Sequence, residues 1–184
     1  MTSELRVDRI IPTNGVASVA QNLGGNAGGS VIQIRHSNTN NQSFADAETP
    51  SSAFVATGIS GVITPTRSDS KILIIASPSV MIYQNSGNQC NGSIKIMRSI
   101  SGGSYTECSP IQIGTQIGFY DYGGNGGITY GNYSLIGVDE PSTTSEVTYQ
   151  FYVKRLGGTG IRMGYELTGD IGSNSFITMM EIAG

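Results

Sequence analysis

An alternation of apolar and polar residues over residues 146–156 constrains the fold more than any other feature of this sequence. Val147, Tyr149, Phe151 and Val153 occupy every second position in this segment. A period of two places those side chains on one face of a β-strand. No segment of the chain shows apolar residues at the spacings of three and four that a helix requires. The pattern predicts a half-buried strand here and few helices elsewhere.

Other strand-like segments follow one another, separated by turns rich in glycine, asparagine or proline. Segment 71–83 opens with the apolar run from Ile72 to Ala76, which predicts a central strand buried on both faces. Residues 37–52 are polar and are predicted to form a long exposed loop. The other predicted strands are 31–36, 54–65, 93–100, 111–114, 128–138, 160–167 and 175–182. Such a series predicts an all-β fold, an antiparallel β-sandwich or jelly roll with an extended N-terminal arm.

The first 30 residues differ in composition from the rest of the chain. Leu5, Val7, Ile10 and Ile11 lie within ten residues of each other, and a Gly-, Ala-, Ser- and Asn-rich stretch follows Pro12. Glycine-rich stretches behave as flexible spacers. We expect residues 1–30 to be an anchoring arm and tether, whose four aliphatic side chains dock on another protein. A frayed terminus without a role is the alternative. Residues 31–184 are expected to form the β-sandwich domain.

Charge argues against nucleic acid as a partner, and the lack of a long apolar run argues against a membrane. Charged residues make up 12% of the sequence, the net charge is −3, and the 10 Lys and Arg residues are scattered. Nucleic-acid binding usually needs a basic patch, so we expect no nucleic-acid partner. No apolar run approaches the roughly 20 residues that cross a bilayer, so no membrane insertion is expected. The acidic residues Glu4 and Asp8 do not fit a secretory signal, which predicts synthesis in the cytoplasm.

Residues able to carry enzymatic chemistry are few. His36 is the one histidine, and it is expected to face solvent at a strand end. A glycosidase needs two carboxylates across a cleft, and each candidate has an ordinary turn or strand role in the sequence. These candidates are Asp121, Asp139, Glu140, Glu146 and Asp170, with Asp139 expected to cap its own turn. We therefore expect no enzyme, no cofactor and no metal site.

Cys90 and Cys108 are the two cysteines of the chain. In a protein made in the cytosol, free thiols are favoured. The alternative is a disulfide that forms after release into an oxidising medium.

Tyrosines gather around the glycine-rich stretch at residues 123–127. Tyr120, Tyr122, Tyr130 and Tyr133 lie within a few residues of it. Tyrosine offers an apolar ring and a polar tip, which suits a carbohydrate- or protein-binding surface. These four residues are our candidate surface-recognition residues. The alternative is that they pack in the sandwich core or between subunits.

Several segments resemble structural proteins of cyanophages and other marine phages, which are often identified as tail-fibre or virion structural proteins. The similar segments are SELRVDRIIPTNG at residues 3–15, ITPTRSDSKILI at 63–74, DEPSTTSEVTYQFYVK at 139–154 and SFITMMEIAG at 175–184. Residues 84–135 form the variable part. The resemblance implies a virion location and brings no catalytic residues with it.

Three functional hypotheses follow from these observations. The first is a homo-oligomeric tail fibre or tip protein, expected to be a homotrimer, that docks on tail, baseplate or capsid proteins and contacts a glycan or protein of the host surface. The second is a capsid decoration protein, favoured by the arm and the low charge. The third is a depolymerising enzyme, which the ordinary roles of the acidic residues disfavour.

Overall fold

The computed structural model describes residues 29–40, 53–84, 89–110, 112–120, 126–157, 159–163 and 174–184. The regular elements in these ranges are all β-strands. They are β1 (Val31–Asn40), β2 (Val55–Ile63), β3 (Lys71–Ser77), β4 (Ser79–Gln84), β5 (Gln89–Ile100), β6 (Thr106–Glu107), β7 (Ile113–Tyr120), β8 (Gly127–Asn132), β9 (Leu135–Asp139), β10 (Val147–Gly157), β11 (Gly160–Met163) and β12 (Asn174–Ile182).

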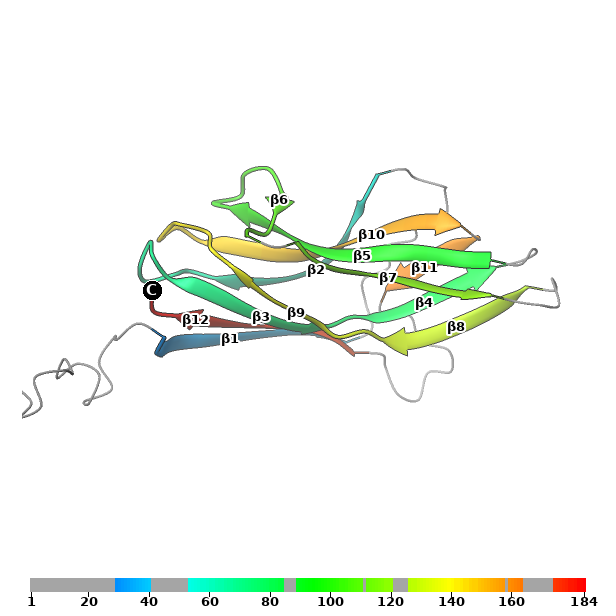
Figure 1. Ribbon diagram of the computed structural model, residues 1–184, viewed down its shortest axis with the longest axis horizontal. Helices are drawn as coiled ribbons and strands as arrows, with labels where there is room; N and C mark the ends of the chain where they lie inside the picture. The colour runs from blue at the N-terminus through cyan, green and yellow to red at the C-terminus, as the bar shows by residue number, and fades with distance from the viewer. Residues whose placement is uncertain are drawn as a thin grey trace, which may run out of the picture.

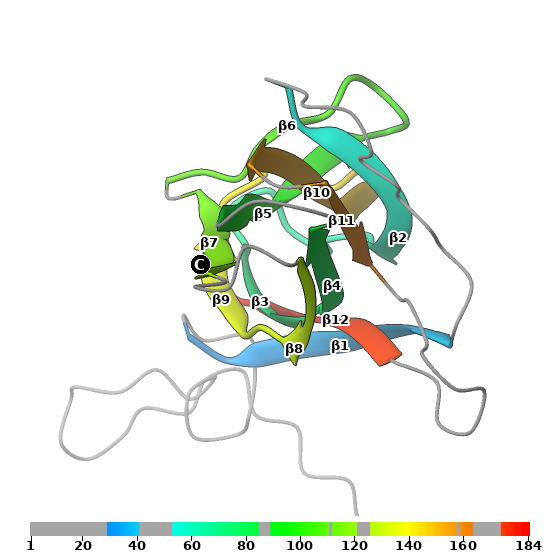
Figure 2. The same ribbon diagram turned by 90° about the vertical axis from the view of Figure 1, so that its right-hand side faces the viewer.

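The strands form two facing layers and a small third sheet at one end (Figures 1 and 2). The lower sheet in Figure 1 has the order β1-β12-β3-β9, and the upper sheet has β2-β10-β5 with β6 and β7 beyond β5. The third sheet, β11-β4-β8, is made of strands that continue from both layers. All pairings between the strands are antiparallel. The predicted all-β antiparallel sandwich is confirmed, while the N-terminal arm lies outside the described residues.

The core lies between the two layers and follows the period of two. Val147, Tyr149, Phe151 and Val153 of β10 are fully buried, as the alternation over residues 146–156 predicts. Burying a large apolar side chain contributes about 1.5–3 kcal/mol, so this strand alone supplies a substantial part of the folding free energy. The other large buried core residues are Ile59, Ile63, Ile72, Ile74, Ile82, Ile94, Ile96, Ile113, Ile117, Leu135, Ile161, Met163, Ile177 and Met179.

Two predicted strands are each divided in the structure. Segment 71–83 breaks at Pro78 because proline has no N–H group to donate to a sheet. Segment 128–138 breaks at residues 133–134, and the Tyr133 N–H donates to the Pro78 carbonyl at 3.1 Å. The two breaks therefore lie side by side, and together they turn β4 and β8 away from the lower sheet.

Other predicted boundaries are also wrong. Residues 37–40, expected in a loop, continue β1 along β12, and β7 extends to Tyr120.

The two ends of the described chain meet at one end of the sandwich. Gly29 N–H donates to the Ala183 carbonyl at 2.8 Å, and Ala183 N–H donates to the Ser30 carbonyl at 2.9 Å. The strand ends beside residues 85–88, 121–125 and 158 lie at the opposite end of the molecule (Figure 1). Residues 29–30 and the end of β12 thus lie at one end of the molecule, and these strand ends lie at the other.

Candidate functional site

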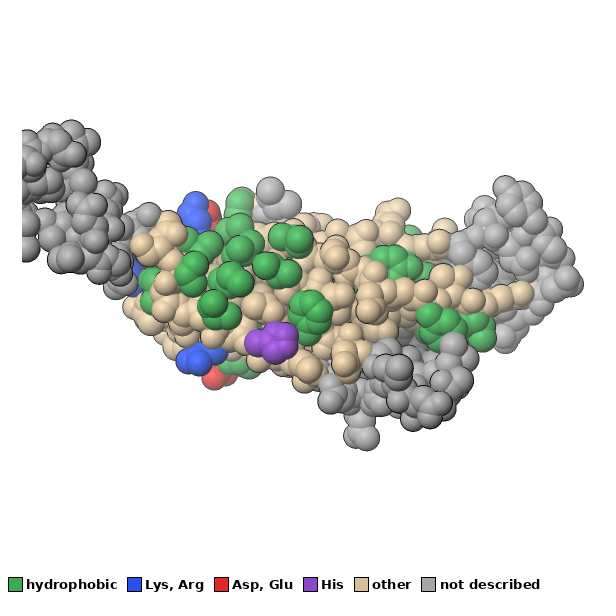
Figure 3. All heavy atoms as spheres, turned by 90° about the horizontal axis from the view of Figure 1, so that it is seen from below, with side chains coloured by type: hydrophobic (Ala, Val, Ile, Leu, Met, Phe, Trp, Pro, Cys, Tyr) green, Lys and Arg blue, Asp and Glu red, His purple; other side chains and the backbone are tan. Residues whose placement is uncertain are grey.

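The outward side of the sheet β1-β12-β3-β9 carries rows of apolar side chains. In one row across the sheet, Ile34 lies opposite Met180, Met180 opposite Leu73, and Leu73 opposite Val138. In the next row Ile75 lies opposite Ile136. We name the apolar face by its members, Val31, Ile34, Leu73, Ile75, Ile136, Val138, Phe176, Met180 and Ile182. Figure 3 shows hydrophobic side chains gathered on this side of the molecule.

Several members of the apolar face are accessible to solvent. Ile34 and Ile136, on opposite edges of the sheet, are 55% and 66% exposed. Four strands spaced at about 4.8 Å and seven residues long at about 3.4 Å per residue cover roughly 450 Å². Contiguous apolar patches of this size on soluble proteins are often functional. The apolar face is therefore a candidate interaction surface.

The central strand β3 is apolar on both of its sides, which suggests that a partner covers the outward side. Ile72, Ile74 and Ala76 point inward and are buried, whereas Leu73 and Ile75 point outward and are half-buried. The prediction that this strand is buried on both faces is thus wrong for the single chain. A strand apolar on both sides is typical of a sheet covered on both sides. One cover is the core of the chain, and the second would come from a partner.

A groove continues the apolar face past β9. Ile113, Ile136, Gly137 and Val138 line it, and its cavity volume is about 500 Å³. A Cβ atom on Gly137 would lie 2.6 Å from Cγ1 of Ile113, so this glycine permits the close approach of β7 to β9. The Lys71 and Glu140 side chains form an ion pair at 3.0 Å beside it. Charge is thus confined to the margin, and the groove offers apolar surface that a partner can fill.

His36 lies at another margin of the apolar face, within β1 and not at the strand end that the sequence predicts. Its Nδ1 lies 2.9 Å from Oγ1 of Thr178, and its ring lies 5.7 Å from the ring of Phe176. The ring is exposed, as expected. Its neighbours are a hydroxyl and an aromatic ring, so its contacts are those of a surface packing residue.

The residues predicted to anchor and to recognise fall in different parts of the molecule. Leu5, Val7, Ile10 and Ile11 lie outside the described residues, and so does Tyr122. Tyr120 ends β7, and its side chain is not among those described. Tyr130 is 37% exposed on β8, while Tyr133 is half-buried and packs against the core. Tyr130 thus fits the recognition hypothesis, and Tyr133 fits the packing alternative.

Asp139 has a structural role that the sequence did not reveal. It ends β9 with its side chain buried, so the prediction that it caps its own turn is wrong. Its carboxylate accepts from Arg98 Nη1 at 2.5 Å, from Ser109 N at 2.7 Å and from the Tyr149 hydroxyl at 2.7 Å. Burial works against the Arg98 charge, but the hydrogen bond and attraction of Asp139 outweigh it and raise the pKa of Arg98. Asp139 therefore joins the two layers.

Cys108 is a buried free thiol. Its Sγ lies 3.7 Å from the Ile96 carbonyl, and burial raises its pKa to about 12. The pairing of Met97 with Glu107 places Cys108 beside Ile96, about six residues, or roughly 20 Å, along β5 from Cys90. A disulfide needs Cα atoms within about 7 Å, so the two cysteines of one chain do not bridge in this fold.

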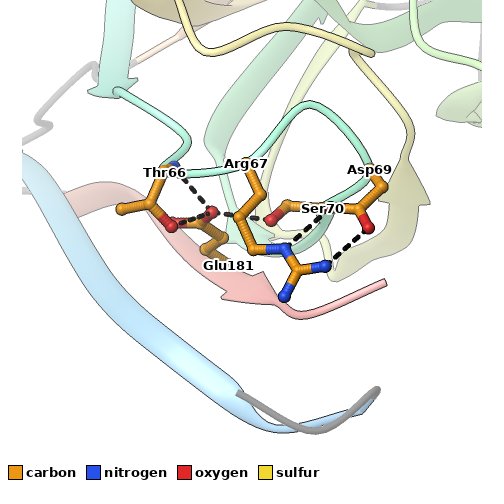
Figure 4. Close-up of polar contacts among 5 residues, drawn as sticks. All are labelled: Thr66, Arg67, Asp69, Ser70 and Glu181. Carbon is orange, nitrogen blue, oxygen red and sulfur yellow. Dashed lines mark hydrogen bonds and ion pairs between the residues drawn. The ribbon is translucent and has the colours of Figure 1, made fainter.

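Glu181 joins the apolar sheet to the loop that precedes β3 (Figure 4). Its Oε1 accepts from the Thr66 N–H, the Thr66 hydroxyl and the Ser70 hydroxyl at 2.7, 2.9 and 2.7 Å, and its Oε2 accepts from Gln33 at 2.6 Å. Burial alone would raise the pKa of Glu181, but these hydrogen bonds favour the carboxylate and lower it. Nearby, Arg67 and Asp69 form a two-point contact at 2.9 and 2.7 Å.

Acidification is expected to weaken the fold through Glu181. Because the folded-state pKa lies below the ordinary 4.5, the carboxylate stabilises the fold above that value and loses its contribution as the pH falls through the lowered pKa. Glu181→Gln should therefore lower the melting temperature near pH 7 and flatten its decline between about pH 5 and pH 3. Thermal unfolding followed by circular dichroism measures both, with the exposed Glu140→Gln as control. Parallel pH profiles of Glu181→Gln and the wild type would contradict this role.

The described residues contain no group of three or more His, Cys, Asp and Glu side chains arranged to hold a metal ion. Within the same part of the chain, no helix has the length and hydropathy to span a membrane.

Comparisons with known proteins give distant structural likenesses. No protein-family model matches the chain, and no curated protein matches it significantly. A structure of infectious bursal disease virus, Gx strain, aligns over 84% of this chain and 38% of its own at 11% identity, with a TM-score of 0.34. The enzymatically active domain of bacteriophage CBA120 tailspike protein 4 aligns over 72% of this chain and 18% of its own, at 16% identity and TM-score 0.22.

A third likeness covers this chain from end to end. A structure of a marine algae virus of the order Picornavirales aligns over 100% of this chain and 81% of its own, at 8% identity and TM-score 0.23. The chain thus spans well under half the length of the first two structures.

Part of the apolar face can be recognised in the sequence. The run from Ile72 to Ala76 indicated two apolar sides of β3, and Phe176 and Met180 occupy the outward positions of β12. What the sequence lacked was the neighbour order β1-β12-β3-β9, which brings Ile34 and Ile136 to the same side of one sheet.

Proposed function

We propose that this chain is a non-enzymatic structural protein of a virus particle, a homo-oligomeric component of a tail fibre or its tip. The N-terminal arm docks on a tail, baseplate or capsid protein through Leu5, Val7, Ile10 and Ile11. The β-sandwich associates with copies of itself, and its far end contacts the host surface. The particle is its location, after synthesis in the host cytoplasm.

The apolar face is the observation that carries this proposal. Its members are the outward residues of a sheet whose inward residues already form the core. A second copy of the chain is the occupant that we assign to it. A standard interface takes about 800 Å² from each partner, and the face of roughly 450 Å² supplies somewhat more than half of that area, to which the adjoining groove beside β9 adds. A closed ring, with three copies expected, would cover the face of every subunit.

The two ends of the sandwich differ, and this difference supports assigning docking to one end and host contact to the other. Gly29 and Ala183 are paired at one end, so the arm leaves the sandwich there. The opposite end has the strand ends that flank residues 85–88 and 121–125, and β8, which carries Tyr130, begins there. An arm-held particle component would present that opposite end outward. Several copies would then contact the host together, so that weak individual contacts add up.

A capsid decoration protein is the second candidate. The arm, the low charge and a self-associating sandwich suit it equally well. Copy number separates the two: hundreds of copies per particle indicate the capsid, and a few to some dozens indicate the tail.

Host contact is tested with the purified full-length protein. Added in excess to host cells, it should block adsorption of the phage that encodes it and bind to the cells. Heat-denatured protein is the control. Native oligomer that neither binds the cells nor slows adsorption would contradict the attachment function.

Removal of residues 1–12 tests the arm separately. The truncated chain should fold and keep the mass of the wild-type oligomer, because the described strands and the apolar face lie in residues 29–184. It should no longer attach to particles that lack this protein, since burial of each aliphatic side chain contributes about 1.5–3 kcal/mol to docking. Circular dichroism, light scattering and cosedimentation with particles are the measurements. Unfolding, or dissociation into monomers, would show instead that the arm belongs to the core or to the self-interface.

A further inference from the structure

A second concave surface lies on the upper layer, on the outward side of β5, β7 and β10. We name it the lysine groove by the side chains that form it: Phe54, Lys95, Gln112, Gln116, Lys154 and Leu156. Its cavity volume is about 490 Å³, which is within the usual range for small-ligand sites. Figure 2 shows β5 and β7 in the layer opposite β1 and β12. The groove therefore stays open when the apolar face is covered.

Bare backbone forms part of the floor of the lysine groove. At Gly114 on β7, a Cβ atom would lie 2.8 Å from the Ile94 carbonyl oxygen and 3.0 Å from Cβ of Lys95. A side chain at this position would clash with β5, so the hollow depends on glycine. A ligand can approach the sheet closely here.

Positive charge in the lysine groove exceeds its local compensation. Nζ of Lys95 lies 4.1 Å from the ring centroid of Phe54, and Nζ of Lys154 lies 5.8 Å from the same centroid. Glu107 pairs with Lys95 at 2.6 Å. Among the described residues, Lys154 has no carboxylate within ion-pair distance. Of the two ammonium groups beside this ring, that of Lys95 is thus paired with a carboxylate and that of Lys154 is not, and an anion bound near them would relieve their repulsion.

The remaining groups of the groove narrow the chemical class of that anion. Gln116 and Ser93 bring an amide and a hydroxyl, which suit the hydroxyls of a sugar. Leu156 is 48% exposed and offers an apolar wall to the C–H side of a pyranose ring. A net charge of −3 on the chain disfavours a long polyphosphate backbone such as that of nucleic acid.

We propose that the lysine groove binds an acidic saccharide, with its carboxylate or sulfate group held by Lys95 and Lys154. This inference rests on the proposed attachment function and names the chemical class of its host ligand. Lys95 is oriented by Glu107 and Phe54, and Lys154 supplies the uncompensated charge. The hydroxyls of the sugar bind to Gln116 and Ser93.

Binding is measured by isothermal titration with the full-length protein at about physiological salt, where exposed charges are screened beyond roughly 8 Å. The probes are alginate oligosaccharides for carboxylates, sulfated dextran for sulfates, neutral dextran, and single-stranded DNA of similar length. One acidic saccharide should bind, and neutral dextran should not. Lys154→Gln should weaken that binding at least about tenfold, as loss of a charge-assisted hydrogen bond does. Arg67→Gln removes an equal charge from an exposed ion pair outside both grooves and should change the affinity less than about twofold.

Three results would overturn the assignment. They are binding of neither acidic saccharide, equal weakening by Arg67→Gln and Lys154→Gln, and DNA binding as tight as saccharide binding. Circular dichroism confirms that each variant is folded, and because Lys154 is a surface residue its replacement leaves the core intact.

The adsorption assay separates this proposal from the attachment function. If Lys154→Gln loses saccharide binding but blocks adsorption as well as the wild type, the groove is not the host-contact site and the attachment function stands. If the wild type binds the saccharide but does not block adsorption, the groove stands as a saccharide site and the attachment function fails.

Discussion

Asp139→Ala is expected to lower the free energy of unfolding by about 3–5 kcal/mol, the cost of breaking a buried ion pair by removing one partner. Asp139 is fully buried and satisfies Arg98, the Tyr149 hydroxyl and the Ser109 N–H at once. Its removal leaves a guanidinium with a 15% exposed side chain and a buried phenol without their acceptor. Denaturant unfolding followed by circular dichroism gives the free energy of unfolding.

A milder variant and a surface control accompany this measurement. Asp139→Asn keeps the shape and part of the hydrogen bonding, and it should fall between Asp139→Ala and the wild type. It also remains measurable if Asp139→Ala does not fold. Asp69→Ala breaks an exposed ion pair with Arg67 and should have little effect. An Asp139→Ala protein within about 1 kcal/mol of the wild type would show that Asp139 does not join the layers as described.

Two charged substitutions in the apolar face should convert the oligomer to monomers. In the proposed assembly, Ile34→Glu with Ile136→Glu removes two buried aliphatic side chains from each subunit and places two carboxylates against apolar surface. Each lost isoleucine is worth about 1.5–3 kcal/mol, so the dissociation constant should rise at least about 100-fold. Light scattering should change from a multiple of 19.3 kDa to that mass. Both residues are more than half exposed in the single chain, so folding should be kept.

Val62→Glu is the matched control for this experiment. Val62 is an exposed valine of β2, in the opposite layer and outside the apolar face. Its substitution should leave the oligomer mass unchanged. An Ile34→Glu, Ile136→Glu protein with the wild-type mass would show that the apolar face is not the self-interface.

The parts of the fold that the sequence predicts are those fixed by local patterning. The alternation from Val147 to Val153 appears as the fully buried side of β10. Successive side chains of a strand within a sheet point to opposite faces of the sheet, so every second residue faces the core. The all-β class follows in the same way. Strand breaks were less predictable: Pro78 was visible, but its effect depends on the hydrogen bond that its carbonyl accepts from Tyr133, 55 positions later.

The candidate sites depended on pairings over long sequence separations. Glu181 meets Ser70 across 111 positions, and Asp139 meets Arg98 across 41. Lys95 and Lys154 reach the same ring only because β5 and β10 are adjacent. Neither charge nor spacing along the chain indicates such a meeting, since strand order decides it. The arm is expected from composition alone, and both the arm and its docking stay predictions.

The pairing of Gly29 with Ala183 has a mechanical consequence. In the proposed assembly, a pulling force between particle and host would pass through the arm into the first residues of β1. It would act along that strand. The β1–β12 hydrogen bonds run across this direction, from Val31–Ile182 to Asn40–Asn174. They would be loaded in shear together rather than peeled open one after another, which makes β1 a suitable strand for transmitting a pull between anchor and body.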